Sequence, residues 1–214
     1  MDLLFNTAFK ALLVKDVSQW TDWNELDNDF NNLEWKPNVE NTVSKNLNFL
    51  DQEKYQPLKD LILNECKGFL DNTVFIGGQY EGLRMTNSWG NITEPGHSHH
   101  EHQHPFSVVS GVIYLDDNPS NFNLHVESFI PDVPYFMPVK RNYTKLGTLI
   151  ADAQIDPNSI NHLKHHMVLF LSNSHHFVEQ VPEGQPNRRS IAFNTFWSGH
   201  TGMESALASI TFND

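Results

Sequence analysis

The chain has 214 residues, 39% of them hydrophobic, and its 26 acidic and 14 basic residues give a formal net charge of −12. This length and apolar content suit a single domain, residues 1–214, with a buried core. The acidic balance argues against binding nucleic acid through a basic face, and the one cysteine excludes a disulfide framework and a thiolate zinc site.

The N-terminal residues predict no targeting or membrane segment. The stretch MDLLFNTAFKALLV has an acid at position 2 and neither a basic region nor a small-residue cleavage pattern. The apolar stretches are far shorter than the roughly 20 residues that a membrane span needs. With its single cysteine, the chain is expected in a reducing cytoplasm.

Residues 1–72 are predicted to form a segment that supports the rest of the fold. The first 50 residues are polar and rich in Asn and Asp, with scattered tryptophans. From position 57 onward apolar residues fall at helical spacing, and Pro57 suits a first helical turn. The spacing predicts a helix over 57–70, with Cys66 as a core residue on its apolar stripe.

The sequence pattern of residues 73–199 is typical of a β-structure. Eight β-branched or aromatic runs are broken by Gly, Pro and Asn: 73–80, 82–93, 107–115, 122–129, 146–152, 167–172, 175–181 and 189–197. Such short, evenly spaced runs predict a sandwich or barrel, against which the helix would pack. Residues 131–142 have three prolines and no period, and are expected to form a loop.

Histidines are concentrated just before one of these runs. Five of the twelve histidines lie in the stretch GHSHHEHQHP, residues 96–105. Side chains two residues apart on a strand share a face, so His102 and His104 could reach one ion, and His176 could supply a third ligand. Three ligands leave positions open for chemistry. The alternative is a solvated histidine-rich loop with adventitious affinity for nickel or zinc.

A second pair of polar residues lies twelve residues beyond His176. Arg188 and Ser190 are two apart in a strand-like run, so they would project on one face with Ala192 and form a good carboxylate site. A hairpin would then set this face beside the metal. The alternative is that Arg188 and Arg189 form a surface pair neutralised by acids.

Three motifs together resemble the 2-oxoglutarate/Fe(II)-dependent oxygenases of the type common in bacteriophage genomes. The first, HxHPxSxxSGVxYL, spans His102–Leu115; the second, FxSxxxHxV, spans Phe170–Val178; and the third, RxSIxFN, spans Arg188–Asn194. Ser44–Leu50 and the following helix also fit. The resemblance covers roughly residues 44–198. For a phage-encoded protein the cytoplasm would be that of the host cell.

The resemblance implies a mainly β fold, a double-stranded β-helix or jelly roll over residues 73–199, with iron at one end. His102 would be the first ligand and His176 the distal one. Arg188 and Ser190 would hold the far carboxylate of 2-oxoglutarate, with Tyr114 as a weaker candidate. The cofactors would be Fe(II), 2-oxoglutarate and O2, and hydroxylation of a C–H bond, with release of succinate and CO2, would be the usual outcome.

The sequence departs from the wider superfamily at the second ligand. That superfamily uses two histidines and one carboxylate, as His-x-Asp or His-x-Glu, whereas this chain has His102-Gln-His104. A pair from His99 and Glu101 remains open as the alternative. The resemblance favours His102 and His104, because their distance to the following strand fits the family pattern, and Glu101 could instead orient an imidazole.

Two other function classes remain open at this stage. Gly96 followed by His102-x-His104 begins like a cupin motif, but the glutamate expected near Ser107 is missing, and a cupin would give Arg188 no role. A non-enzymatic β-protein could use a metal only to stabilise its fold. The prime substrate stays unknown: a protein side chain, such as proline, is preferred by fold analogy over a small metabolite.

Overall fold

A computed structural model describes residues 3–7, 10–73, 80–128, 142–146, 162–203 and 208–213. Two α-helices and three short 3-10 helices accompany the strands. The helices are α1 (Trp23–Asn31), α2 (Gln56–Thr73) and the 3-10 turns Phe49–Asp51, Glu53–Tyr55 and Pro119–Asn123. The strands are β1 (Leu3–Thr7), β2 (Lys10–Asp16), β3 (Trp35–Asn38), β4 (Asn41–Ser44), β5 (Tyr80–Thr93), β6 (His99–His102), β7 (Val109–Tyr114), β8 (Leu124–Ser128), β9 (Asn142–Lys145), β10 (His166–Leu171), β11 (His176–Val178), β12 (Arg188–Met203) and β13 (Ala208–Phe212).

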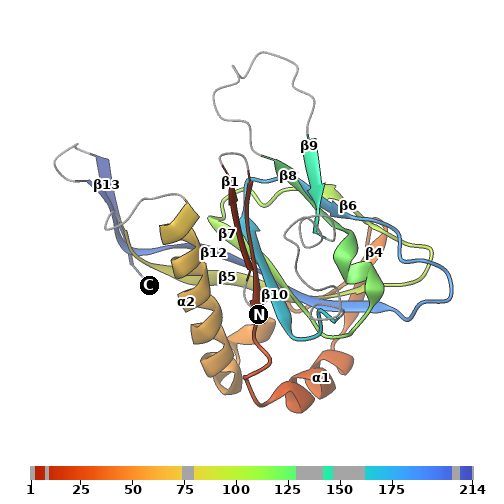
Figure 1. Cartoon of the computed structure of the whole chain (residues 1–214). Coiled ribbons are helices and arrows are strands. Elements are labelled where there is room, and N and C mark those ends of the chain that lie inside the picture. The colour runs from red at the N-terminus through yellow and green to blue at the C-terminus, as the bar shows by residue number, and fades with distance from the viewer. Residues whose placement is uncertain are drawn as a thin grey trace.

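The strands form two antiparallel sheets that face one another (Figure 1). Within the described ranges, the larger one, sheet A, has the order β1-β2-β10-β7-β12-β5-β4-β3, with β13 also paired to β12. The smaller one, sheet B, has the order β6-β11-β8-β9. Two facing antiparallel sheets with strands that cross between them are the arrangement of a jelly roll, as predicted.

Sheet A separates two apolar cores because its side chains alternate between faces. On β7 and β12, Ile113 and Phe193 pack with α1 and α2 in one core. Tyr114 packs instead with Phe170 and with Val126 of sheet B in the other core. Arg188, Ser190 and Ala192 of β12 point to this second side, between the sheets.

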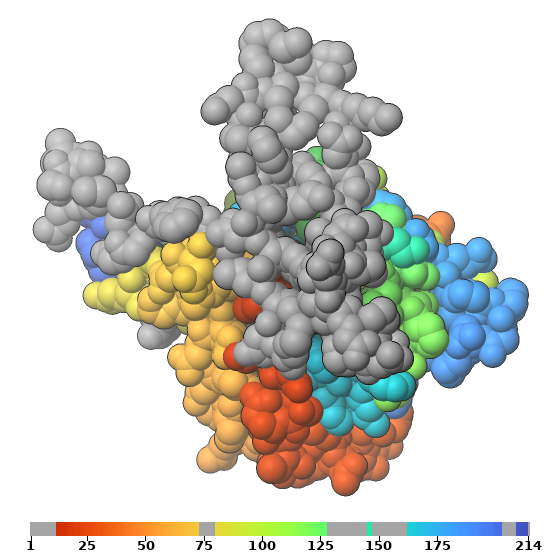
Figure 2. All heavy atoms as spheres, viewed as in Figure 1, coloured from red at the N-terminus to blue at the C-terminus, as the bar shows by residue number. Residues whose placement is uncertain are grey.

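The predicted helix is confirmed as α2, which packs against the outer face of sheet A. Leu58, Ile62, Cys66 and Phe69 are fully or almost fully buried there, so Cys66 is a core residue. Burial raises the pKa of its thiol, which leaves it unreactive. In Figure 2, most of residues 12–72, red to gold, form the lower part and much of the left side of the molecule.

The N-terminal segment also contributes strands that were not predicted. β1 and β2 extend sheet A at one edge, and the β3–β4 hairpin extends it at the other. Six of the eight predicted runs contain a strand as expected, but residues 74–79 of the first run, 147–152 of the fifth and 131–141 of the predicted loop lie outside the described residues. No helix in the described ranges is long and apolar enough to cross a membrane.

Candidate active site

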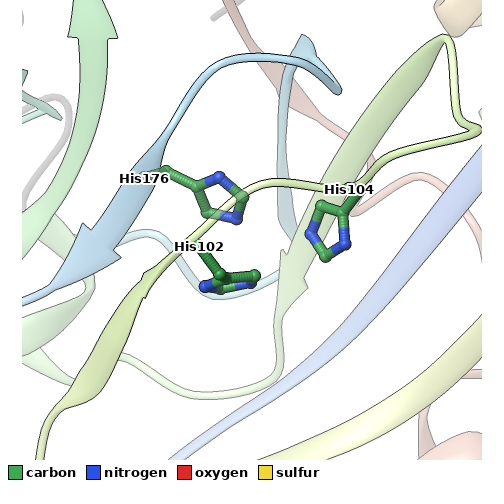
Figure 3. A group of neighbouring side chains, drawn as sticks. All are labelled: His102, His104 and His176. Carbon is green, nitrogen blue, oxygen red and sulfur yellow. The ribbon is translucent and has the colours of Figure 1, made fainter.

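Three histidines converge at the end of sheet B. His102 is the last residue of β6, His104 follows two residues later, and His176 begins β11 (Figure 3). His102 and His176 are direct partners in the strand register. One ring nitrogen from each of the three lies within 4.8 Å of the others, a spacing that could hold one metal ion. We call these residues the histidine triad.

Backbone contacts orient the triad toward a common point. Nδ1 of His102 lies 2.9 Å from the carbonyl of His100, and Nδ1 of His176 lies 3.0 Å from the carbonyl of Ser174. A proton on Nδ1 donates to each carbonyl and leaves the Nε2 lone pair free for an ion. The backbone N–H of His104 donates to the carbonyl of Ser172 at 2.9 Å, which fixes the turn after β6.

The buried surroundings of the triad favour the neutral form of each imidazole, which is the form that binds a metal ion. Burial lowers the pKa of His104 to about 4, and burial also lowers the pKa of His102. The pKa of His176 lies well below its usual value, again mainly because the ring is buried. Metal ligands must be deprotonated, so the site is ready for a cation at neutral pH.

The structure does not bring together the alternative pair. Oε1 of Glu101 lies 3.3 Å from Nδ1 of His175, and its side chain is 42% exposed. Among the described residues, the metal-binding group consists of His102, His104 and His176. Glu101 is therefore placed beside another histidine rather than beside the triad.

A cavity lies between the two sheets, and we call it the inner cavity. The triad lines it together with Arg188, Ser190 and Tyr114. Ser190 and Tyr114 are direct partners in the register of β12 and β7. The structure thus gathers all six residues that the sequence analysis singled out.

The hairpin expected between His176 and Arg188 is wrong. β11 pairs with β6 and β8 in sheet B, whereas β12 pairs with β5, β7 and β13 in sheet A. The chain changes sheets between the two strands. Arg188 therefore reaches the inner cavity from the sheet opposite to His176, rather than from a neighbouring strand.

Arg188 is a buried cation without an acidic partner among the described residues. Only 3% of it is exposed. Nη2 donates to Oγ1 of Thr93 at 3.1 Å, while Nη1 has no hydrogen-bond partner. The hydroxyl of Tyr114 is likewise buried and unpartnered. Burial lowers the pKa of Arg188 to about 10 and raises that of Tyr114 to about 12, although the guanidinium opposes the latter shift.

The alternative prediction, that Arg188 and Arg189 are both neutralised by acids, is correct for Arg189 and wrong for Arg188. Nε and Nη2 of Arg189 donate to both carboxylate oxygens of Asp116, at 2.8 and 2.7 Å. Its Nη1 lies 2.8 Å from Oδ1 of Asp27. An unpaired buried charge is costly, and Arg188, unlike Arg189, has a donor free for an anionic group in the inner cavity.

A second, more open cavity adjoins the triad, and the sequence analysis missed it. This outer groove is lined by His99, His100, His102 and His104 and by residues of β3–β5 and the segment after β4, including Lys36, Asn87 and Trp89. No motif marks Lys36, which lies in the β3–β4 hairpin some sixty residues before the histidines in the chain.

A buried polar cluster connects the three motifs. The Ser110 hydroxyl donates to Oδ1 of Asn194 at 2.7 Å, so its oxygen accepts from the Ser172 hydroxyl, also at 2.7 Å. Each of these residues comes from a different motif. The backbone carbonyl of Ser172 also accepts a hydrogen bond from the backbone N–H of His104. This serine–asparagine cluster therefore ties β7, β10 and β12 to a residue of the triad.

The chain is similar to one protein family and to several solved structures. The model of the family described as "Putative 2OG-Fe(II) oxygenase" matches residues 87–194, slightly more than half of the chain. No curated protein matches. A jelly roll that gathers three histidines and an unpaired arginine in one cavity is suited to an enzyme that binds a metal ion and an anionic co-substrate. The chain belongs to the 2OG-Fe(II) oxygenase family, so it is an enzyme that uses Fe(II), 2-oxoglutarate and O2.

Solved structures share the fold at low sequence identity. A prolyl-4-hydroxylase from Pseudomonas putida is 13% identical, with 88% of this chain and 93% of that chain covered and a TM-score of 0.52. HygX from Streptomyces hygroscopicus, with nickel, 2-oxoglutarate and hygromycin B bound, is 10% identical, with 89% and 84% covered and a TM-score of 0.56. SnoN, an epimerase from nogalamycin biosynthesis, is 10% identical, with 90% and 80% covered and a TM-score of 0.58.

Proposed function

We propose that His102, His104 and His176 hold the Fe(II) of this oxygenase and that the substrate is hydroxylated at a C–H bond. Bound together, Fe(II) and 2-oxoglutarate supply the oxidising power: 2-oxoglutarate, O2 and R–H give succinate, CO2 and R–OH. The spacing and the neutral state of the three imidazoles support this assignment. The residues around the triad determine which molecules reach it.

We assign Arg188, Ser190 and Tyr114 to the far carboxylate of 2-oxoglutarate. The unpaired guanidinium of Arg188, in the same cavity as the triad, is the observation that carries the proposal. A carboxylate would satisfy Nη1 of Arg188 and the hydroxyl of Tyr114 together. A cupin acting without 2-oxoglutarate would leave this buried cation without a role.

We propose that the prime substrate enters through the outer groove, which reaches His102 and His104 from the solvent side. A protein side chain is our preferred target, and a small metabolite is the alternative. The groove is open and has both apolar and amide-bearing walls, which suits either a peptide segment or a compact molecule.

An anaerobic titration tests the assignment. Fe(II) and then 2-oxoglutarate are added to the metal-free protein while the visible charge-transfer band of the chelate is followed. A saturable band at one equivalent of each is expected, and His176→Ala should abolish it. Iron binding without the band would indicate a cupin-like function. Failure to bind iron stoichiometrically would leave the cluster as a histidine-rich surface.

A further inference from the structure

The two cavities at the triad have no acidic lining. No Asp or Glu lies among the described residues that line the inner cavity or the outer groove. Among the described residues, the lysine and arginine side chains on these walls are Arg188 and Lys36. In a chain with 26 acidic and 14 basic residues, the walls thus have a charge opposite in sign to that of the whole molecule.

The inner cavity remains positive after its own ligands are bound, an argument that rests on the function proposed above. Three neutral histidines add no charge to Fe(II), whereas a carboxylate ligand would subtract one. Iron and Arg188 together contribute three positive charges, and 2-oxoglutarate contributes two negative ones. One positive charge is therefore left beside the point where the substrate reacts, in a partly desolvated site where charge interactions are strong.

Lys36 adds a second positive charge on the wall of the outer groove. It is an exposed residue of β3, and its ammonium group forms no ion pair or hydrogen bond with any described residue. Six other lysines do form ion pairs: Lys15, Lys45, Lys54, Lys59, Lys67 and Lys145. The two acids nearest to it in the chain are engaged elsewhere, because Glu34 pairs with Lys45 and Glu40 accepts from Ser98.

Other groups on the same wall can donate to an anion. Nδ1 of His100 is buried and has no hydrogen-bond partner, and the amide of Asn87 forms no hydrogen bond with the described residues. Trp89 lines both cavities and offers a flat apolar surface. We infer that the prime substrate is an anion, with a carboxylate or phosphate group that lies against Lys36 while its reacting carbon faces the triad.

The test compares two probes of the same shape and different charge, benzoate and benzamide, with inorganic phosphate as a third probe. Each is titrated anaerobically into the full-length protein saturated with Fe(II) and 2-oxoglutarate, and the shift of the visible chelate band is followed. Benzoate is expected to bind about fivefold to tenfold more tightly than benzamide, and phosphate to compete with it.

Variants assign the effect to Lys36. Lys36→Met should leave the chelate band unchanged and reduce the preference for benzoate, and Lys36→Glu should reverse it. Lys164→Met is the matched control, since Lys164 lines a separate cavity beside Trp23, and it should keep the preference. An equal response to benzoate and benzamide, including no response to either, would overturn the inference. Absence of the band in the unmodified protein would instead refute the proposed function.

Discussion

Replacing Arg188 with methionine should stabilise the metal-free protein and abolish its response to 2-oxoglutarate. Arg188 is buried without an acidic partner, and its ligand is absent from the metal-free protein. Methionine keeps much of the side-chain length and removes the buried charge. Most core substitutions lower stability, so a gain here would be specific to a charge that is held for a ligand.

The magnitude follows from the pKa of the guanidinium. Its fall from 12.5 to about 10 corresponds to about 3 kcal/mol of destabilisation of the charged form. At pH 7 the group is protonated in both the folded and the unfolded state, so the full penalty is present and does not vary near neutral pH. Loss of the hydrogen bond to Thr93 lowers the free energy of unfolding by about 1 kcal/mol. The net gain of about 2 kcal/mol would raise Tm by about 4–8 °C.

Thermal unfolding of the two proteins checks this, first without metal and then anaerobically with Fe(II) and 2-oxoglutarate. At a hundred times its Kd, 2-oxoglutarate should add about 2.7 kcal/mol to the unmodified protein and nothing to Arg188→Met. Arg189→Met, which loses the pairing with Asp116, should be slightly destabilised and keep its response to 2-oxoglutarate. A metal-free Arg188→Met that melts below the unmodified protein, or that keeps the ligand shift, would refute the reasoning.

Three further predictions concern the triad and its surroundings. His104→Ala should lose stoichiometric Fe(II) binding and His99→Ala should retain it, as measured by metal titration; the opposite pattern would return the site to the alternative ligand pair. Ser172→Ala, which removes the donor to the serine–asparagine cluster, should weaken Fe(II) binding about tenfold. Its unfolding temperature should fall no more than that of the control Ser88→Ala, which alters an equally buried serine. Equal iron affinities in the two variants would contradict the positioning role of Ser172. Gly111→Ala should lose about 1–3 kcal/mol in urea denaturation, because the added carbon would meet a ring atom 2.4 Å away; unchanged stability would show that the core relaxes freely.

Features with strong local periodicity could be predicted from the sequence. Helix α2 follows from its apolar spacing, and the β-branched runs mark strands such as β7 and β10. The triad was predictable because two ligands lie two residues apart beside a strand. For the helix, the strands and the pair of His102 and His104, the signal lies within a few residues, so local physical chemistry is sufficient. His176 lies more than seventy residues further along the chain, and its assignment also depended on the family resemblance.

Features that depend on distant contacts could not be predicted. β3 and β4 have only four residues each, and β3 contains a proline, so they carry little strand signal of their own. Arg188 lies across the inner cavity from His176 because the chain changes from sheet B to sheet A between β11 and β12. The short sequence separation of the two residues does not reveal that change. Lys36 has no motif to distinguish it from a solvated surface lysine, and only the fold places it beside the triad.

Strand β6 is held weakly by its neighbours. It pairs with β11 through only two register positions with an irregularity between them, and its other edge has no partner among the described strands. Its backbone amides should therefore exchange rapidly with solvent in the metal-free protein. An ion bound by His102 and His176 would link these two strands directly and slow that exchange. Deuterium uptake across His99–His102 would thus report metal occupancy without turnover, co-substrate or a known substrate.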